Sequence, residues 1–200
     1  RDLHFTIHSF PTRRSSDPAW SAALPFPEAA FDLVWSNLGL QWAGDPEPVV
    51  REVHRVLAPE GLFLFTSLGP DTLAELRSAL PAGYRAPPSL PVFLDMHDVG
   101  DALTRAGFTG VVMEAETITV TYPDLRSLLE DARATGSGAV LRDRARGLLT
   151  PRRLRALEEA LPREEGRLPA RFEVVYGHAW RAEGPGAAAD ASGVARIGVD

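Results

Sequence analysis

The sequence predicts an α/β fold in which a helix connects parallel strands. Residues Phe31–Ser36 form a short apolar run that ends in small polar residues, which is typical of a buried parallel strand followed by a functional loop. A second apolar run, Leu62–Phe65, follows after a helix-like segment. Because the two runs belong to a strand–helix–strand unit, we expect the strands to be parallel and the crossover to be right-handed.

The helix between these strands has clear start and stop signals. Asp45 suits an N-cap, and Pro46 suits the first helical position. Pro59 and Gly61 are expected to end the helix. Its apolar face is expected to consist of residues at helical spacing, namely Val49, Val50, Val53, Val56 and Leu57.

The candidate site lies at the ends of these two strands. Ligands of open parallel sheets bind beyond the carboxyl ends of the strands, which here are followed by Ser36–Trp42 and Thr66–Asp71. Polar groups in these loops would orient a ligand, and Trp42 would keep water away from it. The alternative interpretation is loop packing, in which Trp42 simply covers the sheet.

The rest of the chain shows further helical and strand patterns. We expect a helix over Thr72–Leu80 with a Thr72/Glu75 capping box, and a second helix from Asp95 through Ala106. Gly110–Tyr122 is expected to form one bent strand or two short strands. Two further helices are expected to start at Pro123 and Pro151, and the last strand is expected over Arg171–Arg181. Alternation in the last strand predicts one shared face for Phe172, Val174, Tyr176, His178 and Trp180. His178 is expected in the core, and His54 is expected to be exposed.

The composition is that of a globular protein. The 200 residues, 44% hydrophobic and 24% charged, suffice for one domain. No run is long enough for a membrane helix, and the lack of cysteine excludes disulfides and cysteine metal sites. The histidines show no metal-ligand spacing, so no metal site is expected. A net charge of −6 argues against non-specific nucleic-acid binding. We therefore expect a cytoplasmic protein without nucleic-acid or membrane partners.

The two ends of the chain differ from the rest. Residues 1–17 include HFTIHSFPTRRSSD, which has no apolar period that continues into the following chain and which resembles a translated sequencing adapter. This segment is expected to be non-native and is left out of the expected fold; the alternative is a disordered native terminus. Residues 182–200, rich in Ala and Gly, are expected to form a disordered tail.

Several phrases of the sequence resemble class I S-adenosylmethionine (SAM) methyltransferases. They are LPFPEAAFDLVWSNLGLQW and VVREVHRVLAPEGLFLFTSLGPDTLAELRSAL. Two later phrases, DMHDVGDALTRAGF and GRLPARFEVVYGHAWR, narrow the resemblance to the malonyl-acyl-carrier-protein O-methyltransferases of biotin synthesis. Together the phrases cover roughly Leu24–Arg181.

The resemblance implies the C-terminal part of a Rossmann-like class I methyltransferase sheet, with parallel strands, an antiparallel last strand beside Leu62–Phe65, and a helical insertion. It assigns 18–122 to a partial SAM-methyltransferase domain, 123–168 to an insertion that caps the acceptor, and 169–181 to the last strand. The family's Gly-rich loop after its first strand and the acid after its second strand are not found here. The chain is therefore expected to be a fragment that lacks much of the SAM site.

The implied activity is methyl transfer from SAM to the free carboxylate of malonyl-acyl-carrier protein, in the biotin (pimeloyl) pathway. No catalytic acid or base is required, because a carboxylate is already ionised near pH 7. The protein has to align the reactants and exclude water. The expected cofactor-binding residues are Ser36, Asn37 and Leu38, and the expected substrate-binding residues are Gln41, Trp42, Tyr122 and Arg133. Tyr122 and Arg133 flank the inserted helix, where an arginine could hold a substrate carboxylate by two hydrogen bonds; the alternative for Arg133 is an exposed surface position.

Arginines concentrate in one late segment, and the resemblance implies an acidic carrier protein as their partner. Complementary charge would steer the encounter and would be weakened by salt. The alternative is a solvated helix face, which is the common fate of a charge run. The residues expected to form this carrier-protein patch are Arg142, Arg144, Arg146, Arg152 and Arg153.

Three other functions remain open from the sequence. The phrase DTLAELR also resembles a SAM-binding assembly factor of respiratory complex I. A methyltransferase for another small acceptor, such as a quinone precursor, would share the fold. An inactive fragment would act only as a binding module. A methyl-ester product on a malonyl-loaded carrier separates the carrier-protein activity from all three.

Overall fold

The structure is a computed structural model that describes residues 4–8, 23–43, 45–79, 93–134 and 151–183. Its strands are β1 (His4–His8), β2 (Phe31–Asn37), β3 (Leu57–Leu68), β4 (Phe108–Tyr122) and β5 (Leu168–Arg181). Its helices are the 3-10 helix η2 (Leu40–Trp42) and the α-helices α1 (Pro46–Val56), α2 (Ala74–Ala79), α3 (Met96–Arg105), α4 (Leu125–Ala134) and α5 (Pro151–Ala160).

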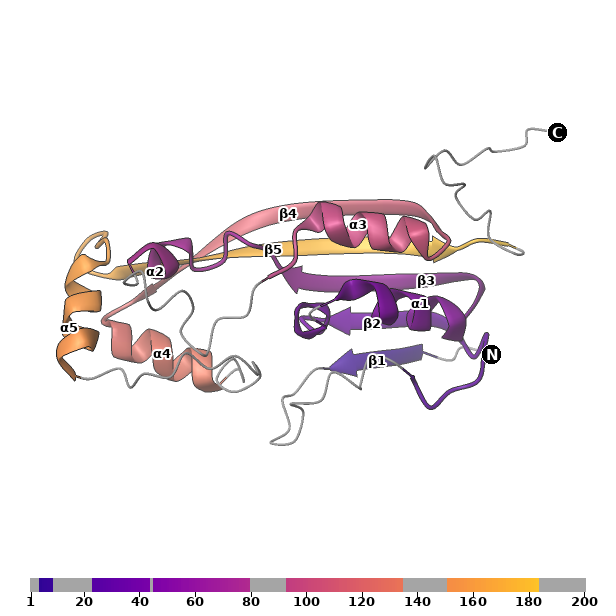
Figure 1. The fold of residues 1–200 in the computed structure, drawn as a ribbon, viewed down its shortest axis with the longest axis horizontal. Coiled ribbons are helices and arrows are strands. Elements are labelled where there is room, and N and C mark those ends of the chain that lie inside the picture. The colour runs from indigo at the N-terminus through magenta and orange to yellow at the C-terminus, as the bar shows by residue number, and fades with distance from the viewer. Residues whose placement is uncertain (1–3, 9–22, 44, 80–92, 135–150, 184–200) are drawn as a thin grey trace.

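The strands form one mixed sheet in the order β1-β2-β3-β5-β4. β1, β2 and β3 are parallel, whereas β5 runs antiparallel to both β3 and β4. The parallel β2–β3 pair and the antiparallel last strand beside β3 confirm the prediction. Figure 1 shows that β4 and β5 continue well past the end of β3 as a two-stranded ribbon.

Strand β1 lies within residues 1–17, which were expected to be non-native and outside the fold. It pairs in parallel with β2, from His4 opposite Leu33 to His8 opposite Asn37. The five residues are rich in aromatic and β-branched types, and the open edge of β2 offers unpaired backbone groups to such a segment. Leaving these residues out of the sheet was therefore wrong. Their origin stays a prediction, and 9–17 lie outside the described residues, as does most of the expected tail from 184 onward.

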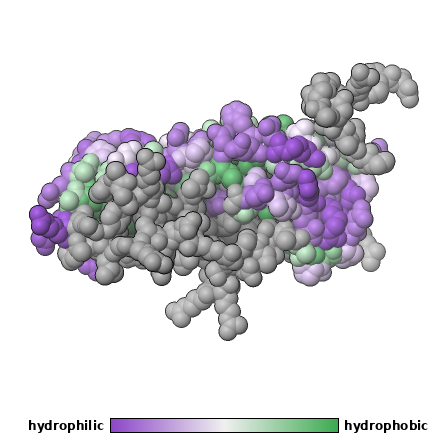
Figure 2. Space-filling model, viewed as in Figure 1, coloured by the Kyte–Doolittle hydropathy of each residue, from purple (hydrophilic) through white to green (hydrophobic). Residues whose placement is uncertain are grey.

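Helices α1 and α3 lie against the same face of the sheet (Figure 1). Both begin at the predicted caps, since Asp45 Oδ1 accepts a hydrogen bond from Glu47 N (3.0 Å) and Asp95 Oδ1 accepts one from His97 N (2.8 Å). The surface over these two helices is mainly hydrophilic (Figure 2), which agrees with apolar faces turned inward.

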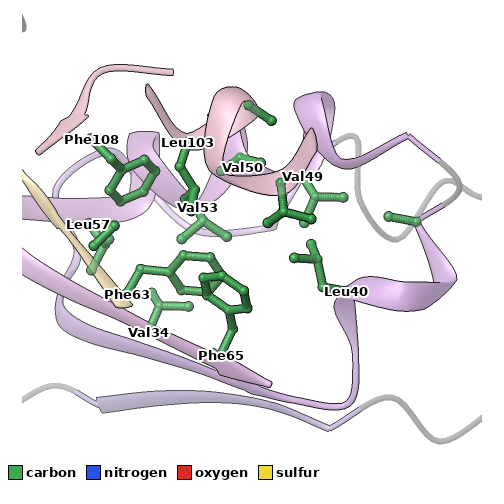
Figure 3. Close-up of a cluster of buried hydrophobic side chains, with 14 of the residues drawn as sticks. Val34, Leu40, Val49, Val50, Val53, Leu57, Phe63, Phe65, Leu103 and Phe108 are labelled. Carbon is green, nitrogen blue, oxygen red and sulfur yellow. The ribbon is translucent and has the colours of Figure 1, made fainter. Parts of the chain in front are cut away.

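The main core lies between these helices and the sheet (Figure 3). Phe63 is its central aromatic residue: its ring stacks on Phe65 with 5.0 Å between centroids and lies 6.0 Å from the ring of Phe108. The other fully buried members include Val34, Leu40, Val50, Val53, Val56, Leu57, Ala102 and Leu103.

A second apolar cluster lies at the far end of the β4–β5 ribbon. Helices α2, α4 and α5 pack there on the end of β5. The buried members of this cluster are Leu73, Leu76, Leu125, Leu128 and Leu157, together with Leu168 and Ala170 of β5. Helix α4 starts where the sequence predicts, because Asp124 Oδ1 accepts a hydrogen bond from Ser127 N (2.8 Å). None of the helices in the described part of the chain combines the length and hydrophobicity that a bilayer crossing requires.

Three local predictions were wrong. Leu57 is the first residue of β3 and not part of the helix, because its backbone is extended (φ −69°, ψ 141°). Thr72 does not cap α2, since its hydroxyl bonds the backbone of Glu173. His54 is partly buried, with its ring edge-on to Phe108 at 5.1 Å between centroids. Burial, and then the charge of Arg181, lower the pKa of His54.

The predicted buried face of the last strand was also the wrong one. Tyr176 and Trp180 are 40% and 44% exposed, whereas Val175 and Ala179 are buried. Gly177 belongs to the buried set, and a Cβ atom at this glycine would lie 2.1 Å from Phe65 Cζ. The small residues of β5 therefore face the core because the large ring of Phe65 fills the space opposite them. His178 shares the outer face and is half-buried.

A pair of charged residues fixes the segment that leads into β2. Glu52 Oε1 accepts a hydrogen bond from Leu24 N (2.7 Å), and Arg55 donates to the carbonyl oxygens of Leu24 and Phe26. Arg55 also donates to both oxygens of Glu52 (2.6 and 2.9 Å). These bonds join the segment around Leu24 to helix α1.

Replacing Glu52 by Gln is expected to lower the free energy of unfolding by about 1 kcal/mol at pH 7. The hydrogen bond from Arg55 holds the pKa of Glu52 below its usual value. A lowered folded-state pKa gives stability that is present above the unfolded-state pKa and is lost as the pH falls through the folded-state pKa. Urea titrations of both proteins at pH 7 and near pH 3 check this. A difference that persists unchanged at low pH would contradict the assignment.

Candidate functional site

Buried polar residues gather at one edge of the sheet. In the part of the chain that the structure describes, the buried polar residues are Ser36, Gln41, Ser67 and Thr72, each between 0% and 6% exposed. All of them lie at or just beyond the carboxyl ends of β2 and β3. Because polar residues are seldom fully buried, and because Ser67 Oγ is buried without a partner among the described residues, we take this edge as the candidate ligand site.

The loop after β2 is tied to β3 by Thr66. The Thr66 hydroxyl donates to Asn37 Oδ1 (2.7 Å) and accepts from Leu38 N (2.9 Å), which also donates to Thr66 O (3.1 Å). Leu38 has a φ of +49°, a left-handed conformation that non-glycine residues rarely adopt. The contacts to Thr66 hold this strained backbone in place, and such strain is often found at binding sites.

Gln41 joins the 3-10 helix η2 to the end of β3. Its Oε1 atom accepts a hydrogen bond from Leu68 N (3.2 Å), and its side chain is 6% exposed. The neighbouring Leu40 is buried in the main core and anchors the helix. Trp42 is the last residue of η2, but its side chain lies outside the described residues. The structure thus brings Ser36, Asn37, Leu38 and Gln41 together, as the sequence predicts.

The turn after β3 forms the other side of the site. Gly69 N donates to Glu173 O (2.9 Å), and Asp71 N donates to Glu173 Oε2 (2.8 Å). Ser67 Oγ, just before the turn, is buried without a hydrogen-bond partner among the described residues. Ser67 falls within the predicted segment Thr66–Asp71, whereas Glu173 was expected only as part of the last strand. Glu173 lies 102 residues from Asp71 in sequence, so no local pattern signals their contact.

Tyr122 lies away from this edge. It pairs with Leu168 in the sheet, whereas Leu68 at the end of β3 pairs with Val174. Leu168 and Val174 are six residues apart in β5, which corresponds to about 20 Å at the rise of a strand. Tyr122 packs against the second cluster, and burial followed by the negative charge of Asp131 raises its pKa. The structure therefore does not bring Tyr122 together with Gln41.

The arginines of the predicted site are only partly described. Arg133 and Arg153 belong to α4 and α5, but their side chains lie outside the described residues. Arg152 is exposed on α5. Arg142, Arg144 and Arg146 lie outside the described residues altogether. The described residues contain no group of His, Asp or Glu that would hold a metal ion.

Comparisons with known proteins give one consistent result. A family model described as "Methyltransferase domain" matches residues 17–65. The chain is 47% identical over 160 residues to the malonyl-[acyl-carrier protein] O-methyltransferase of Laribacter hongkongensis, covering 79% of this chain and 54% of that protein. It is 44% identical over 182 residues to the enzyme of the same name from Halorhodospira halophila, covering 88% and 61%.

Two solved structures share the fold. The YcgJ protein of Bacillus subtilis superposes with a TM-score of 0.53 at 15% identity, covering 82% of this chain and 69% of that chain. A putative methyltransferase of Bacillus halodurans superposes with a TM-score of 0.50 at 16% identity, with the same coverage. At these identities the likeness concerns the fold alone. The chain spans between about half and three fifths of the length of the two curated relatives.

Proposed function

We propose that this chain takes part in methyl transfer from SAM to the free carboxylate of a malonyl-loaded carrier protein. It is a partial-length relative of the malonyl-[acyl-carrier protein] O-methyltransferases, and it has the Rossmann-like fold of class I SAM-dependent methyltransferases. The observation that carries the proposal is the set of buried polar residues at the carboxyl edge of β2 and β3. This is the edge at which α/β sheets bind their ligands.

The residues present suit the cofactor on one side of this edge. Ser36 is buried at the end of β2, and Asn37 and Leu38 follow it in a loop that Thr66 fixes. We assign these three residues to the SAM side of the site. SAM supplies an electrophilic methyl group on a sulfonium that is a good leaving group. The role of the protein is to hold this loop in one conformation, so that little conformational entropy is lost when the reactants bind.

The acceptor side consists of Gln41 and Trp42 in η2. The Gln41 side chain is fixed by Leu68 N, which leaves its amide group as a neutral hydrogen-bond donor for a carboxylate. A carboxylate acceptor is ionised near pH 7, so these residues need to orient it and exclude water without removing a proton. Tyr122 would contribute only from the second cluster, at the acceptor's more distant parts, and Arg133 of α4 stays an expected acceptor contact.

The activity is tested by incubating the chain with SAM and malonyl-loaded carrier protein and measuring the mass of the carrier. We expect one added methyl group, which base hydrolysis removes as it does from an ester. Binding of SAM without transfer to the carrier would instead favour an assembly-factor-like or inactive protein. Transfer to a small free acceptor, but not to the carrier, would favour a different methyltransferase.

We expect this protein to be located in the cytoplasm.

The carrier protein is expected to dock through the arginines near α5. Arg152 is exposed on this helix, where an acidic partner would find it. Arg152→Glu should weaken carrier binding, and the affinity of the unchanged protein should fall as salt rises from about 0.05 to 0.5 M. Fluorescence anisotropy with a labelled carrier measures both effects. An affinity that does not respond to salt would exclude this patch, and Glu159→Gln on the same helix serves as the control.

A further inference from the structure

One residue of β5 holds the turn that closes the candidate site. Besides accepting from Gly69 N and Asp71 N, Glu173 exchanges two hydrogen bonds with Thr72, whose hydroxyl donates to Glu173 O (3.2 Å) and accepts from Glu173 N (3.1 Å). Both the backbone and the side chain of Glu173 therefore engage the segment Gly69–Thr72, which we call the β3 turn. Thr72 is fully buried by this contact.

The packing of Gly69 matches this contact. A Cβ atom on Gly69 would lie 2.3 Å from Glu173 Oε2 and 2.4 Å from its Cδ. Atoms cannot approach so closely, so any side chain at position 69 would push the carboxylate away from Asp71 N. The φ of Gly69 is outside the left-handed region, so its backbone would accept another residue. The glycine is needed for the close approach of Glu173.

The β3 turn is linked directly to the acceptor side of the site. It continues from Leu68, whose N–H donates to Gln41. On the other side, Arg77 of α2 donates to the carbonyl oxygen of Pro70. The β3 turn therefore directly adjoins the residue that fixes the Gln41 side chain.

We propose that Glu173 is a positioning residue that holds the β3 turn as one wall of the acceptor site. The proposal rests on the proposed function for the identity of the acceptor. In this role Glu173 does not touch the acceptor but acts on it through the β3 turn and Gln41. The contact between Glu173 and the β3 turn is carried by the hydrogen bonds described above. Its effect on the turn can therefore be measured separately from any methyl transfer.

The first measurement is amide hydrogen exchange in the purified chain. Glu173→Ala removes the acceptor of Asp71 N, and exchange at Asp71 is expected to rise by about tenfold. Glu173→Gln keeps an acceptor oxygen and should restore slow exchange. Glu114→Ala, which removes a carboxylate from the neighbouring strand β4 without touching the turn, is the control. Unchanged exchange at Asp71 in Glu173→Ala would overturn the proposal.

A pair of variants tests the packing. Gly69→Ala alone should raise exchange at Asp71 to a similar extent, because its methyl group displaces the carboxylate. In the Glu173→Ala background the same change should add little, because the clashing side chain is gone; this is the non-additivity expected of residues in contact. An equal effect of Gly69→Ala in both backgrounds would show that the glycine does not serve Glu173.

The second measurement is the affinity for malonyl-pantetheine, followed by calorimetry. We expect several-fold weaker binding by Glu173→Ala, while Glu173→Gln and Glu114→Ala bind as the unchanged chain does. Equal affinity in Glu173→Ala would overturn the positioning role even if the turn loosens. Failure of the unchanged chain to bind malonyl-pantetheine would overturn the acceptor assignment, and the exchange data would still decide whether Glu173 locks the turn.

Discussion

Replacing Phe63 by Ala is expected to lower the free energy of unfolding by about 3–5 kcal/mol, which is a large part of the stability of a domain this size. Phe63 is 1% exposed, stacks on Phe65 and faces Phe108. Truncation removes the buried ring and leaves a cavity between the sheet and helices α1 and α3, which cannot fully close because Val50 and Leu103 are held by their own helices. Urea denaturation followed by circular dichroism measures the loss.

Ile118→Ala is the matched control for Phe63→Ala. Ile118 lies on β4 and is 42% exposed, so its truncation should cost no more than about 1 kcal/mol. If Phe63→Ala were no more costly than Ile118→Ala, Phe63 would not be the centre of the core. Gly177→Ala tests the same core from the other side, because its methyl group would meet the Phe65 ring.

Replacing Gln41 by Glu is expected to lower kcat/KM for a malonyl-loaded carrier by about 30- to 100-fold. The new side chain can still accept the hydrogen bond from Leu68 N, so the local fold should be kept. It would, however, place a negative charge where the acceptor carboxylate has to lie. Since like charges repel strongly in a partly buried site, the loss should appear with carboxylate acceptors and not with neutral ones.

Gln41→Met separates the charge from the hydrogen bond. Methionine is of similar size and uncharged, but it leaves Leu68 N without its acceptor. We expect a smaller loss of kcat/KM than in Gln41→Glu and a modest loss of stability. Steady-state assays with both variants, together with thermal melting, measure these effects. Equal activity of Gln41→Glu and the unchanged protein would contradict the assignment of Gln41 to the acceptor site.

The sequence was sufficient to predict elements that are specified by local signals. Helices α1 and α3 begin directly after Asp45 and Asp95, because the carboxylate of each N-cap satisfies a free N–H group of the first turn. The parallel order of β2 and β3 follows from the helix that connects them. The antiparallel β5 was expected only from resemblance, because no pattern within the strand states which neighbour it joins.

Features that depend on distant partners could not be predicted. The three-residue spacing of Thr72 and Glu75 predicts a capping box, but the Thr72 hydroxyl forms its hydrogen bonds with the backbone of Glu173 instead. The large residues of β5 suggested a buried face, yet Gly177 and Ala179 face the core because Phe65 already fills that space. Composition along one strand does not show what lies opposite it.

The same distinction applies to the candidate site. The loop Ser36–Trp42 was predicted because ligands bind at the ends of parallel strands, and the structure places Ser36, Asn37, Leu38 and Gln41 there. Tyr122 was chosen from its place before a helix, but the length of the β4–β5 ribbon carries it to the second cluster. Strand length beyond the sheet is set by tertiary packing and has no local signal.

The most direct test of the proposed function is competition between two carrier-bound acceptors for an isotopically labelled methyl group of SAM. Malonyl-loaded and acetyl-loaded carrier protein are mixed with the chain, and the label on each is measured by mass spectrometry. The two acceptors differ in the free carboxylate that the site is proposed to orient. Label on the malonyl group alone, as a methyl ester, is the result we predict. Label on both carriers, or on the protein part of either, would contradict transfer to the malonyl carboxylate.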